Sequence, residues 1–432
     1  MNEAVQLRVE VAVVGAGPAG LAAATVAAEC GASVALLDDN PGLGGQIWRG
    51  ETALSKNSSG ANWFARAERS GARRIHSVRI FHLESGRLLG ESSDASYEIS
   101  FNKLILATGA REQFLPFPGW TLPNVFGAGG LQALAKSGLP LAGKRVVIAG
   151  TGPLLLAVAQ YVGDHGGEVV CIAEQTSWLK YVAFGASLLF NSGKRRDAAR
   201  LSWSLRGVRH WKNCWPVAAM GRDRLESVRL SHHGLSKDIP CDYLACGFHL
   251  IPNTEMAEYA GCEIRERFAV VDQYQQSSVA GIYCAGELTG IGGLDRALLE
   301  GQIAGYDAAG RRPLGERLFA SRDTQHVVVE ALKDAFALRE ELKLLPDFDT
   351  LVCRCEDVSF GKLQPYRTWR EAKLQTRCGM GPCQGKVCGT AAEFLFGWKM
   401  DPPRPPLFPV QCSSLAAISH RNCSEELTGE SR

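Results

Sequence analysis

The sequence lacks several features that would point to common classes of protein. No two cysteines are spaced as Cys-x-x-Cys, which argues against a mechanism that passes electrons through a redox-active dithiol. No apolar run reaches the length of a membrane span. Charge is balanced, because 47 basic and 45 acidic residues leave a net charge of +2. With no long block of one sign, neither nucleic acid nor a charged membrane surface is indicated as a partner.

Residues 1–9 contain no cationic stretch followed by an apolar segment. We therefore expect no secretory signal and a cytoplasmic protein, free or attached peripherally to the inner face of the membrane. In a large chain of this kind, 14 cysteines favour metal or redox roles over disulfides. Nine are scattered singly, and four of these lie in apolar contexts that predict buried packing residues: Cys30, Cys171, Cys246 and Cys284.

No residue stands out as a substrate base or nucleophile, so the catalytic residues are unknown from the sequence. The histidines sit in segments without catalytic spacing. Arg296 follows a glycine-rich segment and has two readings. It could bind a phosphate or carboxylate, or it could form an ion pair with Asp295 or Glu300.

A dinucleotide-binding fingerprint stands near the start of the chain. An apolar strand is predicted over 9–14, a helix over 21–30 and a second strand over 33–37. The three glycines of the turn permit a tight bend, close approach to a pyrophosphate and close packing of helix on strand. The acid that ends the second strand can accept a hydrogen bond from a ribose hydroxyl. These residues are Gly15, Gly17, Gly20 and Asp38.

A weaker copy of the same pattern begins near residue 143. A strand over 144–149 precedes Gly150 and Gly152, and a later strand ends at Glu174. Leu155 replaces the third glycine and should push the helix away from the strand or alter the turn. The second site therefore either binds a nucleotide (FAD, ATP or NAD(P)) or is a scaffold that stays empty.

The order of these motifs resembles the flavoprotein family with two dinucleotide-binding domains, in which one nucleotide domain is nested inside an FAD domain. The resemblance covers about residues 8–310. It implies that the first fingerprint, an Ala-Thr-Gly segment, a late Gly-acid pair and a glycine loop after the first acid belong to the FAD site. Glu287 stands where the family has aspartate. The matching residues are Gly45, Gln46, Ala107, Thr108, Gly109, Gly286 and Glu287.

Five cysteines crowd into residues 353–388. A Cys-x-Cys pair and a separate glycine-containing loop can supply four thiolates, as an iron–sulfur cluster requires. Zinc is the alternative, but Cys-x-Cys is poor for a tetrahedral zinc site. Spacing alone leaves open which four of the five bind: Cys353, Cys355, Cys378, Cys383 and Cys388.

This segment resembles the bacterioferritin-associated-ferredoxin type of [2Fe-2S] domain, found at the C-terminus of α subunits of heteromeric amine dehydrogenases. Those enzymes include D-hydroxyproline dehydrogenase, opine oxidase and hydrogen cyanide synthase. Their pattern, Cys-x-Cys-Glu followed by Gly-Met-Gly-x-Cys-Gln-Gly-x-x-Cys, falls on four of the cysteines here. The resemblance implies Cys353, Cys355, Cys383 and Cys388 as ligands, with Cys378 as the alternative.

The same resemblance implies cofactors and partners. Substrate oxidation would occur in a separate FAD-bearing β subunit, and a small γ subunit would be a further partner. Electrons would pass through an interfacial FMN to the cluster and on to an acceptor such as the respiratory chain. The other hypothesis is an autonomous NAD(P)H-dependent flavin reductase. A redox sensor is a third and weaker one.

We therefore predict an α/β fold with two nested Rossmann-like dinucleotide-binding domains and a small, helix-rich [2Fe-2S] domain. Five prolines in residues 401–409 favour an extended path for the tail. The predicted boundaries are 1–142 and 248–312 for the FAD domain, 143–247 for the nested domain, 313–350 for a helical linker, 351–400 for the cluster domain and 401–432 for the tail.

Overall fold

The computed structural model describes residues 4–51, 54, 59–187, 200 and 203–417. The chain forms two compact units. Unit 1 contains the residues up to Ala110, then Pro252–His326 and the residues from Pro402 onward. Unit 2 contains Arg111–Ile251 and Val327–Asp401. The chain passes between the units in two short strands that pair with each other, β7 (Ala110–Glu112) and β16 (Leu250–Pro252).

Unit 1 is built on a seven-stranded mixed sheet in the order β3-β2-β1-β6-β5-β4, with β19 also pairing with β6. β1 runs parallel to β2 and β6, whereas β5 is antiparallel to both of its neighbours. The strand predicted over 9–14 is the carboxyl half of β1. The strands are β1 (Val5–Val14), β2 (Val34–Leu37), β3 (Arg73–Ile75), β4 (Arg79–Glu84), β5 (Arg87–Glu91), β6 (Ser96–Leu106) and β19 (Ile282–Cys284).

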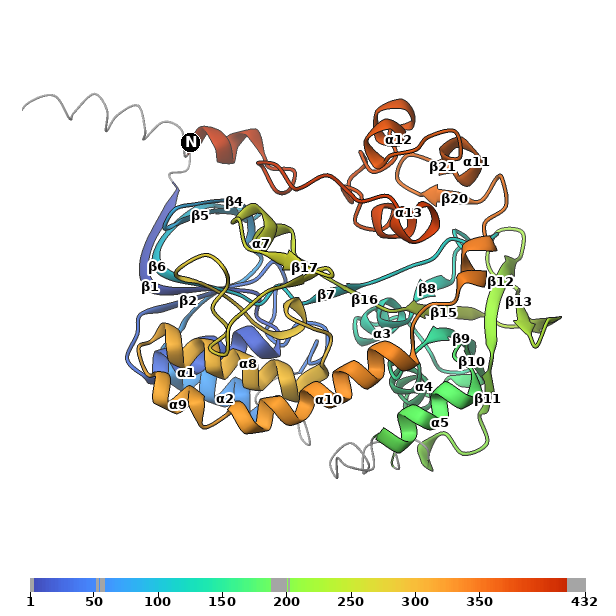
Figure 1. Ribbon diagram of the computed structural model, residues 1–432, viewed down its shortest axis with the longest axis horizontal. Helices are drawn as coiled ribbons and strands as arrows, with labels where there is room; N and C mark the ends of the chain where they lie inside the picture. Colours follow the sequence, from blue (N-terminus) through green and yellow to red (C-terminus); the bar gives the residue numbers. More distant parts are fainter. Residues whose placement is uncertain (1–3, 52–53, 55–58, 188–199, 201–202, 418–432) are drawn as a thin grey trace, which may run out of the picture. The chain divides into compact units, whose positions relative to one another are not determined.

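The two faces of β1 belong to two separate apolar cores, because successive side chains of a strand point to opposite sides. Val11 and Val13 join the core beneath helices α1, α2 and α8, while Ala12 and Val14 join the core beside α7. Figure 1 shows α1, α2 and α8 on one side of this sheet. Outside the sheet, unit 1 contains α1 (Pro18–Glu29), α2 (Ala61–Ser70), α7 (Glu255–Tyr259), α8 (Gly293–Ala308), α9 (Arg312–Glu316), the 3₁₀ turn η2 (Gly286–Leu288) and the hairpin of β17 (Ile264–Arg265) and β18 (Phe268–Ala269).

Unit 2 contains a parallel five-stranded sheet in the order β11-β10-β9-β15-β8 and an antiparallel sheet β12-β13-β14. The predicted second fingerprint lies between β9 and α4. The elements are β8 (Val125–Gly127), α3 (Ala128–Lys136), β9 (Arg145–Thr151), α4 (Leu154–Asp164), β10 (Glu168–Glu174), α5 (Trp178–Ser187), β11 (Arg209–Lys212), β12 (Cys214–Met220), β13 (Ser227–His232), β14 (Leu235–Pro240) and β15 (Tyr243–Phe248).

The α/β fold with Rossmann-like sheets is confirmed. Residues 111–142, which the sequence assigned to the first domain, group with unit 2 in the structure. The reason is that β8 pairs with β15, and α3 contributes Ala128 and Leu131 to a core of unit 2. No helix in the described ranges is both long enough and apolar enough to cross a membrane.

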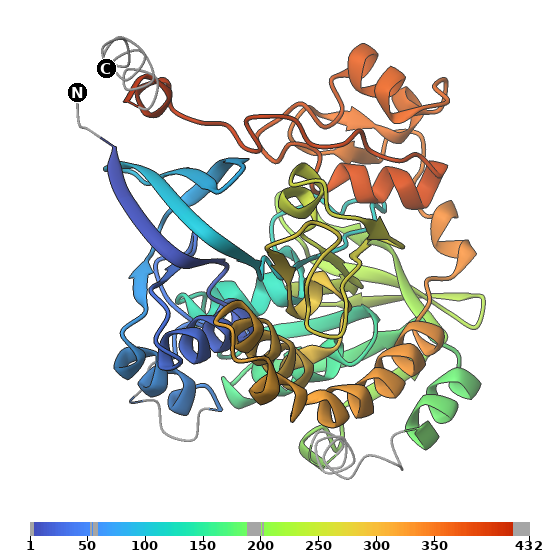
Figure 2. The same cartoon turned by 60° about the vertical axis from the view of Figure 1, so that its left-hand side comes forward.

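The cysteine-bearing residues form a small group within unit 2, drawn in orange to red in Figure 2. Three helices and one hairpin enclose an apolar core that includes Leu363, Trp369 and Ala392. Gly379 adopts φ +82°, and a Cβ there would lie 2.5 Å from the ring of Trp369, so the loop can close over this ring only with glycine. The elements are β20 (Leu351–Cys353), β21 (Val358–Ser359), α11 (Phe360–Leu363), α12 (Trp369–Thr376) and α13 (Cys388–Phe396).

The connecting and terminal segments follow different routes. The predicted linker contains α10 (Phe319–Ala335) and the 3₁₀ turn η3 (Glu340–Leu344). The proline-rich segment joins unit 1, where the amide of Leu407 donates to the carbonyl of Phe81 at 2.7 Å. The Leu407 side chain is buried in a core of that unit. Residues 418–432 of the predicted tail lie outside the described residues.

Candidate functional site

The first glycine loop has the close contacts that its sequence predicts. Gly15 has φ +103°, and a Cβ there would lie 2.2 Å from the carbonyl oxygen of Ala107. A Cβ on Gly20 would lie 1.7 Å from the carbonyl oxygen of Gly15. Gly17 is the N-cap of α1 and faces more open space, because a Cβ there would meet only Gly45, at 4.0 Å. The loop therefore leaves the helix N-terminus approachable by an anion.

Asp38 connects the end of β2 to this loop. One carboxylate oxygen accepts from the amide of Ala16 at 2.5 Å, and the other accepts from the amide and side chain of Asn40 at 2.7 and 2.8 Å. The side chain is buried. Asp38 thus holds the fingerprint loop in shape and lies at its predicted position.

The glycine loop at 42–46 lies directly against the fingerprint. The amide of Gly44 donates to the carbonyl of Ala16 at 2.8 Å. Gly45 has φ +57°, and a Cβ there would lie 2.9 Å from the Cα of Gly17. The side-chain oxygen of Gln46 accepts from Arg49. The structure therefore brings the predicted Gly45–Gln46 pair to the N-terminus of α1.

The Ala-Thr-Gly segment is tied to a residue that the sequence did not single out. Thr108 Oγ1 donates to the carbonyl of Asn253 at 2.7 Å, and Asn253 Nδ2 donates to the carbonyl of Thr108 at 2.9 Å. The amide of Asn253 also donates to the carbonyl of Gly109 at 2.9 Å. These two segments are 145 residues apart in sequence, and no local pattern marks their pairing.

The late Gly-Glu pair also reaches α1. A Cβ on Gly286 would lie 2.8 Å from the Cβ of Ala19. The amide of Gly286 donates to Glu300 at 2.9 Å, and Glu300 in turn forms an ion pair with Arg296 at 2.6 Å. Of the two readings of Arg296, the structure contains the ion pair with Glu300. Burial raises the pKa of Glu287 to about 7.

The second fingerprint has a different arrangement. Gly150 has φ +135°, and a Cβ there would lie 1.9 Å from the carbonyl oxygen of Gly247. Helix α4 begins at Leu154, with Pro153 as its N-cap, whereas Pro18 is already helical in the first copy. The turn is therefore one residue longer. Leu155 is buried, and its Cδ2 lies 3.4 Å from the position of a Cβ on Gly247, so this glycine makes room for it.

Glu174 closes the second loop. One carboxylate oxygen accepts from the amide of Gly152 at 2.8 Å, and the other from the amide of Thr176 at 2.9 Å. Burial raises the pKa of this carboxyl group, against the lowering effect of these amides.

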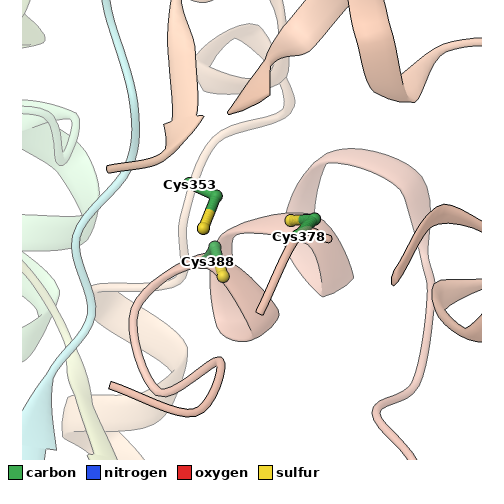
Figure 3. Close-up of side chains that lie close together, drawn as sticks. All are labelled: Cys353, Cys378 and Cys388. Atoms are coloured by element: carbon green, nitrogen blue, oxygen red, sulfur yellow. The ribbon is translucent and has the colours of Figure 1, made fainter. Parts of the chain in front are cut away.

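The clustered cysteines form a buried group of three and an adjacent, more exposed pair. The sulfur atoms of Cys353, Cys378 and Cys388 all lie within 4.8 Å of one another and are buried (Figure 3). Cys355 is exposed and Cys383 half-buried, and their thiols hydrogen-bond to each other. The structure thus joins two of the four predicted ligands with the alternative, Cys378.

The electrostatics of the buried group favour a thiolate. The thiols of Cys378 and Cys388 hydrogen-bond to Cys353 and lower its pKa well below the ordinary value, and the backbone amides of Gly379 and Glu356 add to this effect. Thiolates are the form that binds metals. A Cβ on Gly381 would lie 2.3 Å from the Cβ of Cys355, so the second loop can approach the Cys-x-Cys segment only with glycine there. The set of soft thiol donors suits an iron–sulfur cluster or zinc.

The four lone cysteines predicted as packing residues divide three to one. Cys171, Cys246 and Cys284 are buried, as predicted. The prediction for Cys30 is wrong, because this residue caps the C-terminus of α1 and is partly exposed.

Comparison with known proteins identifies the family. Residues 9–310 match the family described as pyridine nucleotide-disulphide oxidoreductase. The chain belongs to this family. It is an oxidoreductase, and membership implies FAD as a cofactor. The matched region ends before the cysteine group, which the family pattern does not include.

Two relatives match nearly the whole chain. A subunit of opine oxidase from Rhizobium meliloti (strain 1021) is 32% identical over 94% of this chain and 98% of that protein. Hydrogen cyanide synthase subunit HcnB of Pseudomonas protegens is 31% identical over 93% of this chain and 96% of that protein. The resemblance inferred from the motifs is confirmed for these two enzymes. Among solved structures, L-proline dehydrogenase from P. horikoshii shares the fold, with a TM-score of 0.67 and 21% identity over 96% of this chain and 81% of that one.

Proposed function

We propose that this chain is the electron-transferring subunit of a heteromeric, dye-linked dehydrogenase that oxidises a secondary amine or amino acid. The observation that carries the proposal is the group of buried thiols that follows a flavoprotein fold in one chain. The near-complete coverage of HcnB and of the opine oxidase relative supports it, since both are named as subunits. The absence of a recognisable substrate base in the sequence fits a substrate site on a partner chain.

The residues gathered around α1 would hold the FAD. The fingerprint glycines would face the pyrophosphate, and Asp38 would accept from the ribose. The loops after β2, β6 and β19 would border the flavin half, with Glu287 accepting from a ribitol hydroxyl. FAD, when bound, supplies exchange of electrons in pairs or singly. The proposed contacts are Gly15, Gly17, Gly20, Asp38, Gly45, Gln46, Ala107, Thr108, Gly109, Gly286 and Glu287.

Four of the five clustered cysteines would hold a [2Fe-2S] cluster. We propose Cys353, Cys355, Cys383 and Cys388, with Cys378 as the alternative. Burial and mutual hydrogen bonds support Cys353 and Cys388, and the contact between Cys355 and Cys383 supports the other two. Cys378 lies as close to the buried sulfurs as its neighbours do, so only substitution separates ligand from neighbour.

The proposed partners follow from the subunit relatives. An FAD-bearing β subunit would oxidise the substrate, FMN would lie where the two subunits meet, and a small γ subunit would complete the enzyme. The acceptor would be a component of the respiratory chain. The substrate class comprises D-hydroxyproline, opines, proline and, because HcnB is a close relative, glycine.

The decisive experiment compares two electron donors. The purified chain, saturated with FAD, is mixed anaerobically with NADH or NADPH, and the complex with its copurifying partner is assayed with a dye and a panel of amines. We expect no flavin bleaching by nicotinamide nucleotides and dye reduction by at least one amine. Rapid bleaching of the chain alone would instead support an autonomous NAD(P)H reductase. Iron and acid-labile sulfide near two per chain would support the cluster, whereas stoichiometric zinc without sulfide would exclude it.

A further inference from the structure

The segment that follows α10 covers the second glycine loop. This covering segment, residues 335–339, is hydrogen-bonded to three consecutive parts of the site. Thr151 Oγ1 donates to the carbonyl of Phe336 at 3.4 Å, and Thr176 Oγ1 donates to the carbonyl of Ala335 at 3.4 Å. Gln175 Nε2 donates to the carbonyl of Ala337 at 3.0 Å.

The ring of Phe336 occupies the space above the second glycine. Its Cγ lies 4.0 Å from the position of a Cβ on Gly152, and only 3% of the residue is exposed. The ring packs against Phe184, with ring centroids 5.1 Å apart. In a Rossmann-type site this glycine exists so that a pyrophosphate can approach the backbone. Here an aromatic side chain of the same chain takes that position.

The acid of the second site is also fully engaged. Glu174 accepts from the amides of Gly152 and Thr176 and from the hydroxyls of Thr151 and Thr176, and only 1% of the residue is exposed. A carboxylate has about four acceptor positions. No position is left for a ribose hydroxyl, and the residues present do not fit a bound dinucleotide.

We propose that the second dinucleotide-type site is closed by the covering segment and accepts neither NAD(P)H nor any other adenosine nucleotide. The domain instead anchors the segment that leads into the cysteine group. Arg339, the last residue of the covering segment, stacks on Trp215 at 4.7 Å and hydrogen-bonds Asn213. Trp120 Nε1 then donates to the carbonyl of Leu351, in the strand that carries Cys353, at 2.6 Å.

This inference is independent of the proposed function, because it concerns nucleotide binding and not amine oxidation. It also separates the chain from its family in one respect. The fold of the pyridine-nucleotide domain is retained, while its ligand is replaced by five residues of the protein itself.

The test uses the full-length, FAD-saturated chain and isothermal titration with ADP-ribose, which is redox-inert, followed by NADH and NADPH. Two variants open the site: Phe336→Ala removes the ring, and Gln175→Ala removes the side chain that donates to the carbonyl of Ala337 and accepts from the amide of Arg339. Phe348→Ala is the matched control, since Phe348 is exposed and lies in the same unit. We expect no binding up to millimolar ligand by the wild type and the control, and at least about tenfold tighter binding by an opened variant.

Two results would overturn the inference. Micromolar binding of ADP-ribose by the wild type would mean that the site is open. Failure of both opened variants, with intact flavin spectra and circular dichroism, to bind better than Phe348→Ala would mean that the covering segment is not what excludes nucleotides. Either result leaves dye-linked amine oxidation untouched, so the two proposals fail separately.

Discussion

The contact between α1 and α8 gives a sharp quantitative prediction, because α1 carries the first glycine loop at its N-terminus. Gly301 in α8 lies against the backbone of α1. A Cβ added there would lie 2.1 Å from the carbonyl oxygen of Ala19 and 2.8 Å from its carbonyl carbon. Backbone atoms cannot rotate away, so Gly301→Ala must push the two helices apart by about 1 Å.

The expected magnitude follows from two opposed effects. Alanine in place of glycine in a helix interior stabilises by about 0.5–1 kcal/mol, whereas overpacking a close contact costs about 1–3 kcal/mol. We expect Gly301→Ala to destabilise unit 1 by roughly 1–2 kcal/mol and to weaken FAD retention, because the start of α1 moves. Gly163→Ala is the control. Gly163 lies in α4 with no atom within 4 Å of an added Cβ, so this variant should gain the helix-propensity term alone.

The assay must report on unit 1 by itself, because unfolding of a two-unit chain is not a single two-state transition. Hydrogen exchange of peptides from α1 and α8, with FAD content measured after dialysis, meets this need. Faster exchange in both helices and lost FAD are expected for Gly301→Ala only. If Gly301→Ala matches the wild type, or if Gly163→Ala loses FAD equally, the close-packing explanation is wrong.

Three further predictions concern the cysteines, the pH and the tail. Cys383→Ser should lose the visible cluster spectrum and Cys378→Ser should keep it; the reverse outcome would exchange ligand and neighbour. Burial raises the pKa of Glu287 from 4.5 to about 7. Because the raised pKa favours the neutral form in the folded state, stability is complete below about pH 4.5 and is lost as pH rises to and through about 7, by about 3 kcal/mol in the FAD-free protein. Glu287→Gln should remove that slope in urea unfolding at pH 5 and 8, and an unchanged slope would contradict it. Leu407→Ala should destabilise unit 1 by about 2–3 kcal/mol through the cavity left in its core, and exposed Leu415 is the control, with equal effects counting against the packing.

Much of the fold could be predicted because its signals are local. The apolar strand before Gly15, the glycine turn and Asp38 lie within thirty residues of sequence and meet again in the structure. The crowding of the cysteines is similarly visible in the sequence. Their division into a buried group and an exposed pair is not, because it depends on how α12 and α13 fold around Trp369.

What could not be predicted depends on partners distant in sequence. Leu155 indicates a distorted loop, but the room for it comes from Gly247 on β15. Phe336 resembles any apolar residue at a helix end, and nothing near it indicates a contact with Gly152. Glu300 is an ordinary helix glutamate until η2 places the amide of Gly286 against it. In each case the missing information is a tertiary contact and not a local preference.

Unit 1 is assembled from three stretches of chain, the last of which begins at Pro402. Domains generally fold as units while the chain is being synthesised. Unit 2 has all of its residues once Asp401 has been made, whereas the unit 1 core still lacks Leu407 at that moment. The enclosed unit is therefore the first that can be completed, although synthesis starts with the enclosing one. Any loading that requires a finished fold becomes possible at the cysteines before it becomes possible at the flavin loops.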